Sequence, residues 1–112
     1  LLHRAVDILQ PDPAIAGGIT EVRTIAGLAA SHGLTVAPHL WGSAILFATG
    51  LHLCVSTPCA TLVEYSRGHN PLLNDLVEEA IAFEDGHVLA PTGPGLGLTL
   101  RRDFVERVRV AV

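Results

Sequence analysis

Three polar side chains that can transfer protons follow short apolar segments of the chain. They are Asp12 after residues 5–9, His39 after residues 34–37 and Glu64 after residues 60–63. A carboxylate bound to one nitrogen of a histidine ring fixes the tautomer, raises the basicity and leaves the other nitrogen free to move a proton. A further acid beside the histidine could form a hydrogen bond with an oxyanion. If this acid is protonated, it donates the hydrogen bond and acts as an electrophile. These residues therefore predict acid–base catalysis centred on His39.

Each of these residues also has an ordinary explanation when it is taken alone. Asp12 lies between Pro11 and Pro13, which fix the backbone as in a turn. His39 follows Pro38 and could be a loop histidine with no chemical role. The occurrence of such residues at three consecutive predicted strand ends favours the functional interpretation.

The segments that would position these residues alternate between strand and helix. The apolar residues of 19–32 recur at helical spacing, with Thr20 as the expected N-cap and Gly33 as the expected C′ residue. Residues 43–54 predict a second helix that is apolar nearly all round and therefore covered on most sides. The three apolar segments named above predict the strands.

The order strand, helix, strand, helix, strand predicts an α/β fold with parallel strands and right-handed crossovers. The carboxyl ends of such strands lie on one face, and neighbouring strands are about 4.8 Å apart, so Asp12 should reach His39. Three strands cannot close a barrel, and both edges of the sheet would stay open. The pattern makes sense as a segment of a (β/α) barrel.

Residues 72–112 have a different character and are expected to form a separate C-terminal segment of hairpin, loop and helix. Residues 72–79 predict a short helical or irregular stretch, and Glu84-Asp85-Gly86 predicts a hairpin turn. Residues 91–97 form a loop rich in proline and glycine. Residues 102–110 favour a terminal helix, although three valines keep a strand possible.

Composition limits the classes of partner. The chain has 112 residues, of which 49% are hydrophobic and 16% charged, and this length predicts one domain at most. Its net charge is −4, and it contains no lysine. Arginines of the tail 101–109 alternate with acids, which favours a solvated helix face over a nucleic-acid site. The longest apolar stretch, 43–55, is too short and interrupted to span a membrane. Cys54 and Cys59 fit no zinc pattern and predict buried, reduced thiols in a cytoplasmic protein.

Other candidates for chemistry are weaker. His52 lies in an apolar helical segment and favours a packed or surface position over a ligand role. The segment Gly93–Gly97 lacks the Lys-Ser/Thr of a phosphate loop. Trp41 could line a substrate pocket beside His39, and core packing is the alternative for it.

The sequence resembles the C-terminal part of the enolase superfamily, in its mandelate racemase and muconate lactonizing subgroup. The resemblance rests on Gln10-Pro11-Asp12, Gly17 to Glu21, Ala37-Pro38-His39, Glu64 and the closing Pro91 to Gly97. Within the subgroup, residues 39–42 and 64–71 look most like the acid-sugar cycloisomerases and dehydratases. The resemblance covers nearly the whole chain.

The resemblance implies a (β/α)7β barrel with a capping domain. Residues 1–71 would form the last three strand units of the barrel, and the residues after about Leu72 would return toward the capping domain. It implies abstraction of the proton α to a carboxylate, giving an enediolate held on Mg²⁺. His39 would be the general acid/base, Asp12 its partner and Glu64 the group facing the carboxylate of an acid-sugar substrate. Trp41 and His69 would at best line the substrate pocket.

The family's metal-binding carboxylates and its second base, often a lysine, have no counterpart in these 112 residues. Together with the absence of methionine and the character of residues 1–4, this predicts part of a longer enzyme. We expect the complete enzyme to be a homo-oligomer. The alternative is a non-catalytic, truncated βα module that packs against a partner chain. Substrate identity, and the choice between dehydration, cycloisomerisation and racemisation, are not readable from the chain.

Overall fold

A short parallel sheet connects the two halves of the predicted site. The computed structural model describes residues 1, 3 and 5–110. The expectation that residues 1–4 are part of a longer element therefore lies partly outside the described residues. Strand β1 (Ile8–Leu9) pairs in parallel with β2 (Thr35–Val36), with Ile8 opposite Thr35. The ladder continues past both strands, because the His39 N–H donates to the Pro11 carbonyl at 3.2 Å. The predicted parallel pairing of the first two strands is therefore confirmed.

The third predicted strand is much shorter than expected. In place of a strand over residues 60–63, a single parallel bridge joins Ala60 to Val36. The Val36 N–H donates to the Cys59 carbonyl and the Thr61 N–H donates to the Val36 carbonyl, and the ladder ends there. Leu62, two residues after the bridge, is 62% exposed. The order of the three segments is as predicted, but the prediction of a third strand over residues 60–63 is wrong.

Helix α1 (Gly18–Ser31) is the first crossover and has a well-defined end. Gly33 takes a left-handed conformation with φ 68°, and the Leu34 N–H donates to the Ala29 carbonyl, so the predicted C′ glycine is confirmed. The predicted N-cap is wrong. Gly17, with φ 102°, occupies the N-cap position, and Thr20 lies inside the helix, because the Gly17-Gly18 pair lets the chain turn into the helix earlier.

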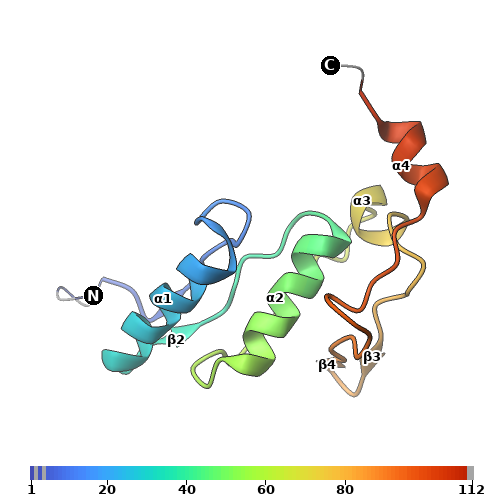
Figure 1. Ribbon diagram of the computed structural model, residues 1–112. Helices are drawn as coiled ribbons and strands as arrows, with labels where there is room; N and C mark the ends of the chain where they lie inside the picture. Colours follow the sequence, from blue (N-terminus) through green and yellow to red (C-terminus); the bar gives the residue numbers. More distant parts are fainter. Residues whose placement is uncertain (2, 4, 111–112) are drawn as a thin grey trace.

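Helix α2 (Ala44–Ser56) forms the centre of the molecule (Figure 1). The Ser43 hydroxyl accepts from the Leu46 N–H and caps the helix. One face is buried with Leu40 in a core cluster that contains Phe47, Leu51 and Leu73. The helix is covered less completely than expected within the described residues, since Val55 is 69% exposed.

The C-terminal segment contains the elements that the sequence predicts. Helix α3 (Pro71–Asn74) is a single turn, and strands β3 (Phe83–Glu84) and β4 (His87–Val88) form an antiparallel hairpin. Asp85 and Gly86 both have positive φ, as a two-residue type I′ turn requires. The end of the chain forms helix α4 (Arg102–Val108), so the helix expectation for this stretch is confirmed over the strand.

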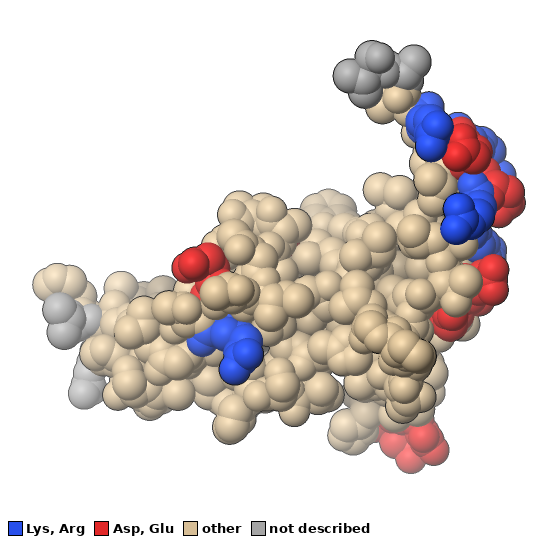
Figure 2. Space-filling model, viewed as in Figure 1, with Lys and Arg blue, Asp and Glu red and all other residues tan. Residues whose placement is uncertain are grey.

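The elements form an elongated arrangement. Figure 1 shows α1 and β2 on one side of α2, with the hairpin, α3 and α4 on the other. The radius of gyration is 15.3 Å, compared with about 13 Å for a compact domain of this length. None of the described helices has the length and apolar character needed to cross a membrane. Charged side chains of both signs gather on α4 (Figure 2), and Arg109 lies 3.2 Å from Glu106.

The two cysteines are free thiols, and both are half-buried where we expected full burial. The Cys59 thiol lies 3.5 Å from the Ala26 carbonyl, against α1. Cys54 lies near the end of α2, with its thiol 3.9 Å from the Leu62 carbonyl. Burial still raises the pKa of the Cys54 thiol above its usual value, so less of it is the reactive thiolate at neutral pH.

Acidification is expected to loosen the attachment of the segment around Thr99. Glu79 Oε2 accepts a 2.7 Å hydrogen bond from the Thr99 N–H, which lowers the pKa of Glu79 below its ordinary 4.5. A group whose pKa is lower in the folded state stabilises the fold above its unfolded pKa. This contribution is lost as pH falls through the lowered pKa, so protection of the Thr99 amide should fall below about pH 4.5.

The measurement is hydrogen exchange at the Thr99 amide, corrected for intrinsic rates, as a function of pH. Glu79→Gln should remove the acid-dependent loss of protection, because the amide does not titrate. Glu78→Gln is the matched control, since the Glu78 backbone bonds to the Thr99 carbonyl through its N–H and not through its side chain. Equal pH dependence in wild type and Glu79→Gln would contradict the assignment.

Candidate functional site

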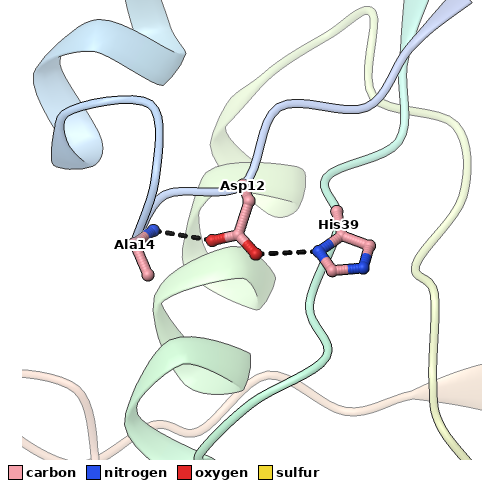
Figure 3. A network of polar contacts seen from close by, with 3 residues as sticks. All are labelled: Asp12, Ala14 and His39. Atoms are coloured by element: carbon pink, nitrogen blue, oxygen red, sulfur yellow. Dashed lines mark hydrogen bonds and ion pairs between the residues drawn. The ribbon is translucent and has the colours of Figure 1, made fainter.

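Asp12 and His39 form a hydrogen-bonded pair at the carboxyl ends of β1 and β2. Figure 3 shows the Asp12 carboxylate between the His39 ring and the backbone of Ala14. Asp12 Oδ2 lies 2.8 Å from His39 Nδ1, and Asp12 Oδ1 accepts from the Ala14 N–H at 2.7 Å. The contact that the sequence predicts between strand ends is present.

The local backbone explains why Asp12 is held so firmly. Its carbonyl accepts from the N–H groups of Ile15 and Ala16, so it opens the turn that leads into α1. Asp12 is only 9% exposed, and a buried carboxylate needs hydrogen-bond partners to offset its lost hydration. Ala14 and His39 supply them. Asp12 is thus the turn-forming residue of the simpler interpretation and also the partner of the histidine.

The histidine is held on one side and open on the other. The side chain of His39 is 37% exposed, and its Nδ1 atom faces the aspartate. If the carboxylate is ionised, Nδ1 carries the proton and Nε2 has a free lone pair in the neutral ring. Among the hydrogen bonds of residues 1, 3 and 5–110, none uses Nε2. This arrangement can take a proton from, or return one to, a group placed beside Nε2.

Glu64 and Trp41 line the same shallow pocket. Two of its lining residues, Leu40 and Trp41, directly follow His39 in the sequence. The pocket has a volume of about 280 Å³ and is lined by Leu40, Trp41, Glu64, Tyr65 and Ser66. Glu64 is exposed, and Trp41 is 69% exposed, so core packing is not its role within the described chain. The walls come from two loops, one after β2 and one after the bridge at Ala60.

His69 lies outside this pocket. It lines a neighbouring pocket of about 440 Å³ together with Arg67, Asn74 and Phe83. Tyr65 contributes to both pockets, so the two spaces are adjacent. The Tyr65 ring also packs edge-on against Phe47 and Phe83. The structure therefore brings Asp12 to His39 and Glu64 to Trp41, and it places His69 one pocket further along.

The described residues do not fit the Mg²⁺ that the resemblance implies. The described residues contain no group of three His, Cys, Asp or Glu side chains close enough to hold a metal ion. The donors at the site are one carboxylate and one imidazole already bound to each other, with Glu64 in the next loop. What these residues can do chemically is hold and move a proton.

The comparison with protein families identifies the fold. A family model described as "Enolase C-terminal domain-like" matches residues 1–104. The chain belongs to this family. Members of the enolase C-terminal domain-like family thus provide the context in which the Asp12–His39 pair can be interpreted.

Relatives of known activity are enzymes that act on acid sugars or their lactones. The chain is 36% identical to D-galactarolactone cycloisomerase from Agrobacterium fabrum, over 95% of this chain and 30% of that enzyme. It is 39% identical to D-xylonate dehydratase from Haloferax volcanii, over 92% of this chain and 25% of that enzyme.

Solved structures show the same fold. The mandelate racemase/muconate lactonizing enzyme from Jannaschia sp. superposes with a TM-score of 0.85 and 40% identity, over 99% of this chain and 28% of that one. The 3,6-anhydro-D-galactonate cycloisomerase from Zobellia galactanivorans superposes with a TM-score of 0.82 and 38% identity, over 91% and 29% respectively. The chain therefore spans between a quarter and a third of the length of these relatives.

Proposed function

We propose that this chain supplies the proton-transfer side of the active site in an enzyme that abstracts the proton α to the carboxylate of an acid sugar or its lactone. The observation that carries the proposal is the 2.8 Å contact between His39 Nδ1 and the nearly buried Asp12 carboxylate. The names of the relatives support the substrate class, since they are dehydratases and cycloisomerases of acid sugars and lactones.

In the proposed mechanism, His39 Nε2 takes the α-proton or returns it to the intermediate. The Asp12 carboxylate holds the ring in the tautomer with the proton on Nδ1, and it stabilises the imidazolium that forms when Nε2 is protonated. Glu64 faces the substrate carboxylate across the pocket that it shares with Trp41. A protonated Glu64 would donate a hydrogen bond to oxygen atoms on which negative charge develops.

We also propose that the chain acts as the C-terminal part of a longer enzyme. It spans about 30% of D-galactarolactone cycloisomerase, and several of its large apolar side chains are exposed. They include Ile15 at 82%, Leu28 at 52% and Leu62 at 62%. Mg²⁺, if used, would bind outside the residues described here.

The test combines native mass with isotope exchange. The chain has a mass of 11.8 kDa and covers 30% of a relative, which by division gives about 40 kDa for a subunit of the complete enzyme. The protein purified from its source should have subunits of this size, and it should exchange the α-proton of an acid sugar or lactone with solvent deuterium in NMR spectra. A stable species of 11.8 kDa without exchange would overturn the proposal and favour a non-catalytic module that packs against a partner chain.

A further inference from the structure

The two loops that form the pocket around Trp41 and Glu64 are joined by one side chain, that of Asn70. Its Nδ2 donates to the Gly42 carbonyl at 2.8 Å, across 28 residues of sequence. Among the hydrogen bonds of residues 1, 3 and 5–110, no other joins residues 39–43 to residues 62–70. The Trp41 wall and the Glu64 wall are therefore held together by this contact and by packing.

Asn70 has a second contact that fixes the direction of its amide. Its Oδ1 accepts from the Leu72 N–H at 3.1 Å, and this bond makes Asn70 the N-cap of α3. The Asn70 N–H in turn donates to Asn74 Oδ1 at 3.0 Å. A carbonyl can only accept and an N–H can only donate, so the two side-chain contacts require an NH₂ group on one side and an oxygen on the other. Of the common N-cap residues, only asparagine carries the donor and the acceptor on two separate side-chain atoms.

The histidine itself is held by different contacts. Asp12 binds the His39 ring, and the Pro11 carbonyl accepts from the His39 N–H. Loss of the bond between Asn70 and Gly42 should therefore move the pocket walls, while the proton-transfer pair keeps its geometry. The consequence should appear in substrate binding more than in the proton-transfer step.

We propose that Asn70 is a positioning residue that sets the separation between the Trp41 and Glu64 walls of the substrate pocket. This role rests on the proposed function, since it assumes that the substrate occupies that pocket. A pocket held by one hydrogen bond between its walls becomes wider and more variable when the bond is lost, and substrate contacts on the two walls can then no longer form together.

Two variants separate the connection to Gly42 from the cap. Asn70→Ser keeps an N-cap oxygen for Leu72 but loses the NH₂ group that reaches the Gly42 carbonyl, whereas Asn70→Ala loses both groups. In the complete protein, both variants are expected to raise KM about tenfold, with kcat per folded active site and the pH profile close to wild type. Ser56→Ala is the control. It removes a 2.7 Å side-chain bond to the His52 carbonyl at the far end of α2, and KM should not change.

Hydrogen exchange gives a readout that does not need turnover. Peptides covering residues 39–43 and 64–69 should exchange several-fold faster in Asn70→Ser than in wild type or Ser56→Ala. Unchanged KM and unchanged exchange in Asn70→Ser, with effects in Asn70→Ala alone, would overturn the proposal and leave Asn70 as a helix cap. If wild type turns over no acid sugar but the loops still exchange faster in Asn70→Ser, the proposed function fails and the connection between the loops stands.

Discussion

His39→Gln is expected to slow exchange of the substrate α-proton about 10²–10⁴-fold in the complete enzyme, which is the range that general acid–base catalysis contributes. Glutamine can keep a hydrogen bond to Asp12 Oδ2, so the turn around Asp12 should survive. It has no group that gains or loses a proton near neutral pH. The measurement is the rate of deuterium incorporation at the α-carbon, followed by NMR at saturating substrate.

The matched control is His32→Gln. His32 is exposed at the end of α1, and its backbone N–H, not its ring, bonds to the Ala29 carbonyl. Thermal stability and exchange rate should both stay near wild type in this variant. Exchange at the wild-type rate in His39→Gln would remove His39 from the role of general acid/base.

Gly50→Ala is expected to destabilise the fold by about 1–2 kcal/mol, although alanine is the better helix former. A Cβ at position 50 would lie 2.1 Å from Leu40 Cδ2 and 2.8 Å from Leu40 Cγ. Leu40 is 2% exposed and packs with Phe47, Leu51 and Leu73, so moving its side chain away from a new Cβ would disturb the core cluster. The gain of about 1 kcal/mol in helix propensity should therefore be outweighed by the cost of overpacking.

The same substitution at Gly27 should have the opposite effect. Gly27 lies within α1, and apart from its chain neighbours and the backbone of its own helix, no heavy atom is within 4 Å of the position that its Cβ would take. Gly27→Ala should raise stability by about 0.5–1 kcal/mol. Thermal unfolding of the two variants beside wild type is the measurement, and a rise in melting temperature for Gly50→Ala would show that Leu40 can adjust. Because Leu40 follows His39, the activity of Gly50→Ala should fall together with its stability.

The contact between Asp12 and His39 could be predicted from the sequence because it depends on local patterns. Two apolar segments separated by one amphipathic helix predict neighbouring parallel strands, and the residues after such strands meet at one edge. The end of α1 was equally predictable, since Gly33 is a residue that takes positive φ without strain. In each case the signal lies within a few residues of the feature.

Features that depend on distant partners could not be predicted in the same way. The third strand is reduced to a bridge at Ala60, because strand length depends on what pairs along the outer edge. The N-cap at Gly17 was missed because Thr20 has the preferred side chain while the glycine pair has the freer backbone. The bond from Asn70 to Gly42 was missed as well. Asn70-Pro71 indicates only a loop, and nothing near it indicates the carbonyl that its side chain reaches.

The hydrogen bond from the His39 N–H to the Pro11 carbonyl determines which changes in chain length the site can tolerate. Side chains alternate between the two faces of an extended ladder, so one residue inserted between Leu9 and Asp12, or between Val36 and His39, would turn one partner to the opposite face. Residues added where α1 joins β2 would lengthen the crossover without changing this alternation. In homologous chains, the crossover between β1 and β2 should therefore vary in length. The spacing from β1 to the acid and the spacing from β2 to the histidine should stay fixed.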